Sequence, residues 1–175
     1  MSKRIWYEKY LPFVARSPEM QVRWIEAALR KGTLSPQEIT PYIRLLLGPD
    51  GGEDRTAILR GLLGELDEAV VERLLAATEI YDVPNLFRLL PAPTLEQIVI
   101  AVTRQPPPYE EAPELIIDKV FQAVFDFSET LLEEAARRVM AADGCPAHFP
   151  TAYERFKEIK ADEKLLSALY PKAIM

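Results

Sequence analysis

A helix-start signal that recurs along the whole sequence most constrains what this chain can fold into. The clearest instance is Ser35-Pro36-Gln37-Glu38. The Ser35 hydroxyl can accept from the Glu38 amide, the Glu38 carboxylate can reach back to the cap, and Pro36 has no amide to leave unsatisfied. The same capping-box spacing recurs at Thr94 with Gln97 and at Thr151 with Glu154. Repeated starts of this kind predict an all-α chain.

Apolar residues follow each start at intervals of three or four, as in Val22, Ile25 and Leu29. This period is helical, and no segment shows the alternation of a half-buried strand. Pro41 either moves the start of its helix to Thr40 or leaves a kink, because a proline inside a helix removes a hydrogen bond. About ten helices are predicted, over residues 18–31, 35–47, 53–65, 67–78, 84–90, 94–104, 113–127, 129–142, 151–160 and 163–170.

The predicted helices pair into five antiparallel hairpins that begin near residues 18, 53, 84, 113 and 151. This spacing of roughly thirty to forty residues is typical of helical-hairpin repeats. The pairs share no sequence pattern and lack the signatures of tetratricopeptide and ankyrin repeats. Residues 1–175 are therefore expected to form a single all-helical domain, either a compact multi-helix bundle or an irregular HEAT-like, repeat-like array.

Composition excludes several classes of protein. The single cysteine, Cys145, allows no intramolecular disulfide, which fits a reducing compartment. The N-terminus lacks the apolar core of a secretory signal, and no apolar run is long enough to span a membrane. A soluble cytoplasmic protein with no membrane partner is the prediction.

Charge argues against general binding of nucleic acid. The net charge is −6, whereas affinity for a phosphate backbone comes largely from cations. The acidic character is uneven, because residues 1–44 carry eight basic residues against four acidic ones. A nucleic-acid partner is thus unexpected, and only the basic segment 1–44 could contact one.

Aromatic residues crowd the N-terminal arm, residues 1–16. Trp6, Tyr7, Tyr10 and Phe13 are four of the sixteen aromatics in the chain, and they lie among basic residues. Large aromatics beside basic groups dominate binding hot spots. A terminal segment uses the same residues to dock onto its own domain. The arm is therefore a candidate partner-binding element, with docking as the alternative.

The only cysteine and the only histidine lie three residues apart, at Cys145 and His148. A thiolate and an imidazole at this spacing could share a metal ion, or the imidazole could activate the thiol. The alternative is a helix-terminating loop without a function, because a structural zinc site needs four protein ligands and no pattern supplies the others. No other motif implies a cofactor.

No catalytic constellation is recognisable, so no catalytic residue is assigned and the chain is expected not to be an enzyme. The leading hypothesis is a non-catalytic protein–protein interaction module, such as an adaptor, assembly factor or regulatory subunit, that presents a helical surface to another protein. The alternative is an enzyme or small-ligand carrier with a site built from dispersed residues. A binding module predicts a broad groove or apolar patch, and an enzyme predicts a deep pocket with convergent polar groups.

Overall fold

The computed structural model describes residues 3–48, 52–104 and 113–170, with the side chains of residues 3–7, 113 and 114 left out. These residues form ten α-helices and no strand, which confirms the all-α prediction. The helices are α1 (Lys3–Val14), α2 (Pro18–Lys31), α3 (Pro36–Leu47), α4 (Gly52–Gly64), α5 (Glu68–Ala77), α6 (Val83–Leu89), α7 (Leu95–Val102), α8 (Pro113–Phe127), α9 (Glu129–Ala141) and α10 (Phe149–Leu169).

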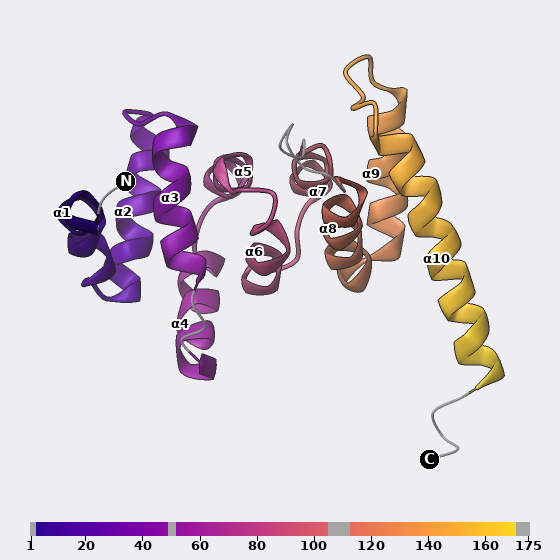
Figure 1. The fold of residues 1–175 in the computed structure, drawn as a ribbon, viewed down its shortest axis with the longest axis horizontal. Helices are drawn as coiled ribbons and strands as arrows, with labels where there is room; N and C mark the ends of the chain where they lie inside the picture. The colour runs from indigo at the N-terminus through magenta and orange to yellow at the C-terminus, as the bar shows by residue number, and fades with distance from the viewer. Residues whose placement is uncertain (1–2, 49–51, 105–112, 171–175) are drawn as a thin grey trace.

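The helices pack in two rows, because each contacts the helix two places further along the chain. One row is α1, α3, α5, α7 and α9, and the other is α2, α4, α6, α8 and α10. Contacts of α2 with α3 and of α8 with α7 and α9 hold the rows together. The chain advances along the long axis of the molecule, and its ends lie at opposite ends of that axis (Figure 1). The result is a multi-helix bundle, one of the two arrangements expected. The fifth predicted hairpin does not form, because residues 151–160 and 163–170 belong to one helix.

Local chemistry fixes several helix starts as predicted. At α3, the Glu38 amide donates to Ser35 Oγ over 3.2 Å and the Ser35 amide donates to Glu38 Oε1 over 3.0 Å. Thr94 and Gln97 form the same reciprocal pair at α7. The helix α3 continues through Pro41, and the neighbouring Thr40 hydroxyl donates to the carbonyls of Pro36 and Ala77. The start of α3 therefore stays at Pro36.

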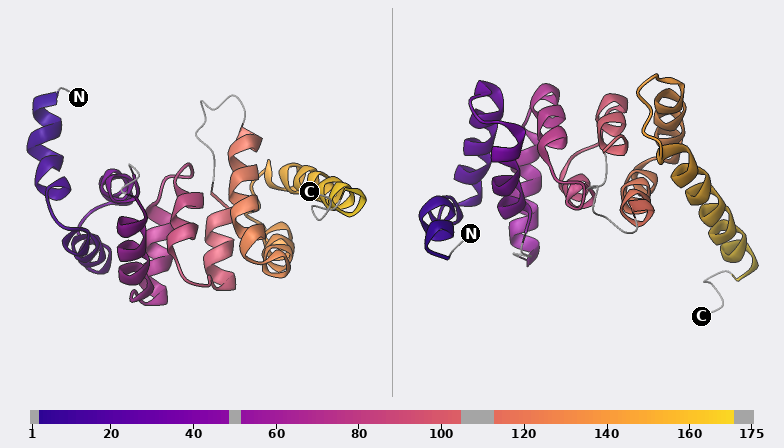
Figure 2. Two further views of the ribbon diagram at one scale, coloured as in Figure 1. Left: turned by 90° about the horizontal axis from the view of Figure 1, so that it is seen from below. Right: turned by 45° about the horizontal axis from the view of Figure 1, so that its top comes forward.

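Two predicted boundaries differ from the structure. Residues 151–160 and 163–170 form the single helix α10, which begins at Phe149 and not at Thr151. No glycine or proline separates Lys160 from Glu163, and the two side chains pair at 3.0 Å along the helix. Residues 3–14, for which no helix was predicted, form α1. Figure 2 shows α1 and α10 at the two ends of the array.

The buried core is continuous along the array, with an aromatic cluster near each end. Near the C-terminus, the ring of Phe121 lies 5.4 Å from that of Phe149 and 5.5 Å from that of Phe156. Each helix therefore presents one face to the core, and the other is left to solvent or to a neighbour. No helix in the described ranges is both long and apolar enough to cross a membrane.

Candidate functional site

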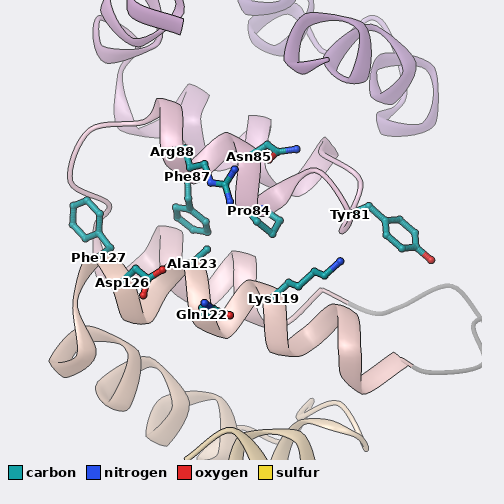
Figure 3. Close-up of a pocket in the computed structure, with 10 residues that line it drawn as sticks. All are labelled: Tyr81, Pro84, Asn85, Phe87, Arg88, Lys119, Gln122, Ala123, Asp126 and Phe127. Atoms are coloured by element: carbon teal, nitrogen blue, oxygen red, sulfur yellow. The ribbon is translucent and has the colours of Figure 1, made fainter. Parts of the chain in front are cut away.

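The candidate site is a groove between two consecutive helices of the second row, α6 and α8, with a cavity volume of about 540 Å³ (Figure 3). We call it the α6–α8 groove. The residues that line it come from α6, from the turn before α6 and from α8. They are Tyr81, Pro84, Asn85, Phe87, Arg88, Lys119, Gln122, Ala123, Asp126 and Phe127.

One face of α8 forms one wall of the groove. Lys119, Ala123 and Asp126 follow one another at intervals of four and three residues, which places them on successive turns of the same helix face. The opposite face of α8 carries Phe121 and Val124, both fully buried in the core. Burial of that face fixes the rotation of α8 about its axis and so directs the polar face into the groove.

The short helix α6 forms the other wall. Phe87 is only 6% exposed and lies at the base of the groove, beside Arg88 (Figure 3). Val83 and Leu86 are buried on the core side of the same helix. The Nε of Arg60, on α4, donates to the carbonyl of Arg88 over 3.1 Å and so caps the end of α6. Contacts with α4 and with the core therefore fix the position of α6, while its other face lines the groove.

Two half-exposed aromatic side chains mark the ends of the groove. Tyr81 is 40% exposed and lies beside Lys119 at one end, whereas Phe127 is 44% exposed and lies beside Asp126 at the other (Figure 3). Aromatic rings lose little conformational entropy on binding and bury a large area, so they are effective contact residues. The groove thus offers an aromatic contact at each end.

Three charged side chains in the groove are left without an ion pair among the described residues. Arg88, Lys119 and Asp126 are exposed, and none of the three forms an ion pair or a side-chain hydrogen bond with another described residue. An exposed charge costs little while water solvates it. These groups are therefore available to a binding partner without first breaking an internal contact.

We call the contact between two neighbouring helices a joint. At other joints, an arginine on or just after one helix donates hydrogen bonds to the carbonyls at the end of the other, and we call such a joint closed. Arg55 of α4 donates to the Leu46 carbonyl at the end of α3 over 2.9 Å. Arg73 of α5 donates to the Leu29 carbonyl near the end of α2 over 2.9 Å. Arg104, after α7, donates to the carbonyls of Ala76 and Thr78 at the end of α5. Each arginine satisfies carbonyls that a helix end leaves unpaired.

A half-buried carboxyl, Asp82, lies in the turn before α6, on the side that faces α3. Asp82 Oδ2 lies 3.9 Å from Nε of Arg44, which also pairs with Glu79 at 3.0 Å. Burial raises the pKa of the Asp82 carboxyl, an effect that outweighs the opposing influence of Arg44, and Glu79 raises it further. Asp82 therefore contributes to packing at this joint and does not face the groove.

Two aromatic residues of the N-terminal arm lie in the core. Tyr10 is 7% exposed and Phe13 3% exposed, and both rings contact Tyr42 of α3, at centroid distances of 5.2 and 5.3 Å. Their rings are docked on the chain's own helices and are not presented to a partner. The side chains of Trp6 and Tyr7 lie outside the described residues. Partner binding by the arm stays a prediction.

A buried amide holds the arm in place. Nε2 of Gln21, on α2, donates to the carbonyls of Phe13 and Val14 at the end of α1, over 3.1 and 3.4 Å. Its Oε1 accepts from Arg55 over 3.3 Å. Because Arg55 also binds the end of α3, this small network joins four helices, and Gln21 is buried although it is polar.

The predicted thiol and histidine pair lies in the loop between α9 and α10. Cys145 is half-buried, and its Sγ donates to the Pro146 carbonyl at 3.6 Å. His148 is exposed and directly precedes α10. In the described part of the chain, no group of three or more His, Cys, Asp or Glu residues is arranged to hold a metal ion. The thiol or metal function of this loop stays a prediction.

Sequence reasoning did not find the α6–α8 groove. Its residues come from two segments some forty positions apart, and Lys119 and Asp126 look like any solvated helix face. The one local signal is Phe127, a large aromatic on the polar side of a helix end. Comparisons with models of protein families, with characterised proteins and with solved structures give no match.

Proposed function

We propose that this protein is a non-catalytic protein–protein interaction module that receives a segment of its partner in the α6–α8 groove. The observation that carries the proposal is the set of three charged side chains, Arg88, Lys119 and Asp126, that face the groove without an ionic partner among the described residues. Other cations of this chain, such as Arg55, reach across to a neighbouring helix instead.

The side chains of the groove suit recognition of a polypeptide. Exposed aromatic rings and arginine are the residue types that supply most of the binding energy at protein interfaces. Tyr81 and Phe127 provide such rings at the two ends, and Arg88 lies between them (Figure 3). A partner segment lying along the groove would bury both rings and meet charged groups on the way, which gives both affinity and register.

The volume of the groove is also compatible with a second function. About 540 Å³ falls within the range of small-molecule sites, roughly 300–1,000 Å³. An enzyme or ligand carrier that uses this groove is therefore the alternative. Native mass spectrometry of the protein isolated from its own source cells distinguishes the two, because a stoichiometric protein partner supports the module and a small-molecule adduct supports the alternative.

Site-directed photocrosslinking tests the module directly. A photoreactive amino acid replaces Gln122 in the groove, and in a matched control it replaces Gln37, another exposed helical glutamine, on α3. We expect a partner to be crosslinked from position 122 and not from position 37. The substitution Phe127→Ala should weaken binding of that partner by roughly tenfold, since truncating a hot-spot aromatic costs at least about 1–2 kcal/mol.

Two results would contradict the proposal. One is equal crosslinking from both positions, which would show that the groove is not where the partner binds. The other is unchanged affinity in Phe127→Ala, measured for the purified partner by isothermal titration calorimetry with the folded state checked by circular dichroism.

A further inference from the structure

We infer that the partner segment recognised by the α6–α8 groove is acidic, with a carboxylate beside a large apolar side chain. This inference rests on the proposed function and adds the chemistry of the ligand. It is drawn from the signs and positions of the charges in the groove, together with the two aromatic side chains at its ends.

The groove is locally positive on an acidic protein. Arg88 and Lys119 supply two cations against the single carboxylate of Asp126, whereas the whole chain has a net charge of −6. Charge complementarity of this kind steers association and disfavours partners of the wrong sign. A basic segment would meet two like charges in the groove, and an acidic one meets two unpaired cations.

The charges are also ordered along the groove, with Lys119 beside Tyr81 at one end and Asp126 beside Phe127 at the other (Figure 3). A partner carboxylate is therefore expected at the Lys119 end, away from Asp126, with Arg88 between the two ends of the groove. The guanidinium of Arg88 can bind a carboxylate through two parallel hydrogen bonds. The ring of Phe127 is left for an apolar side chain of the partner.

The length of the groove sets the size of the segment. Lys119 and Asp126 are seven positions apart on α8, which corresponds to about 10 Å at the helical rise of about 1.5 Å per residue. An extended chain covers that length with about three residues. One carboxylate and one apolar side chain, two or three residues apart, therefore span the two ends of the groove.

Selection from random peptides tests the inference without a known partner. A phage library of short random peptides is selected on the full chain and counter-selected on Phe127→Ala, so that the survivors depend on the groove but are not chosen for charge. We expect the enriched peptides to be acidic and to carry a large apolar residue near the carboxylate.

Charge variants then measure how much each cation contributes to peptide affinity. The tightest-binding selected peptide is synthesised, and its affinity for each variant is measured by fluorescence anisotropy. Lys119→Glu and Arg88→Glu should each weaken binding by about tenfold or more, as expected for a like charge placed against a carboxylate. The matched control Lys31→Glu makes the same change in net charge at an exposed residue at the end of α2 and should change the affinity less than about twofold. Added salt should weaken the wild-type complex, because it screens exposed charges.

Lys119→Gln is the control for a folding defect in Lys119→Glu, since it removes the positive charge without adding a negative one. It should weaken binding less than Lys119→Glu and leave the thermal midpoint unchanged. Groove-dependent peptides that are neutral or basic, or that bind Lys119→Glu as tightly as wild type, would overturn the acidic ligand while leaving the interaction module intact. Failure to enrich any peptide that depends on Phe127 would count against the groove as a polypeptide site, and with it the proposed function.

Discussion

The two sides of α6 are built differently. Toward α4, Arg60 reaches across and donates to the Arg88 carbonyl, so the joint is closed by a hydrogen bond. Toward α8, the helices enclose a groove of about 540 Å³ in which Arg88, Lys119 and Asp126 have no ionic partner among the described residues. One short helix thus takes part in a closed joint and in an open one.

The difference is the basis of the proposed interaction surface. Where cohesion of the array is required, arginines such as Arg55 and Arg73 bind the carbonyls of a neighbouring helix end. Where charged side chains instead face open space, they contribute nothing to internal cohesion, because exposed and unpaired charges are worth little to stability. If the proposed function is right, stability and recognition depend on different joints, and substitutions should separate them.

Two phenylalanines on opposite faces of α8 give the largest expected contrast. Phe121→Ala should lower the free energy of unfolding by about 3–5 kcal/mol, because it empties a fully buried site that packs against Phe149 and Phe156. Phe127→Ala, in the groove, should cost less than about 1 kcal/mol. Urea denaturation followed by circular dichroism measures both, and similar losses would show that the groove face is part of the core.

The arginine caps should give the next largest effect. Arg55→Met keeps the length of the side chain but removes its donors to Leu46 and Gln21. Losing these bonds should cost about 1–3 kcal/mol of unfolding free energy. The matched groove variant Lys119→Met should change it by no more than about 0.5 kcal/mol. If the two variants were equally stable, the distinction between closed and open joints would not hold.

The smallest effect concerns the pH dependence of stability at Asp82. Because burial raises the pKa of this carboxyl in the folded state, the folded protein binds its proton more tightly than the unfolded chain does. Stability should therefore fall as pH rises above about 4, where the unfolded carboxyl ionises. The side chain of Asp82→Asn cannot ionise, so the stability of this variant should not show this fall.

Thermal unfolding of both proteins at several pH values checks the expectation for Asp82. The stability of Asp82→Asn relative to wild type should increase between about pH 3 and about pH 6. A difference that stays constant over this range would mean that the Arg44 ion pair at 3.9 Å compensates fully for burial.

Most helices were predictable from local sequence, and the failures have local causes too. The capping boxes at Ser35 and Thr94 act within four residues, so their helices start where predicted. The Thr151 box failed because α10 already begins at Phe149. Helix α1 was missed because its segment contains Pro12 and no capping box. Burial of Tyr10 and Phe13 against Tyr42 stabilises it.

The sequence by itself determined that this chain is helical and where most of its helices begin and end, because capping and apolar periodicity depend on residues within a turn or two. Only the tertiary structure decided which charges are paired. The contact of Arg55 with Leu46 and Gln21, and the placing of Lys119 and Arg88 in one groove, join segments that are separate in sequence. Such pairings depend on how the two rows of helices stack, and stacking is set by the summed burial of many side chains and not by any local signal.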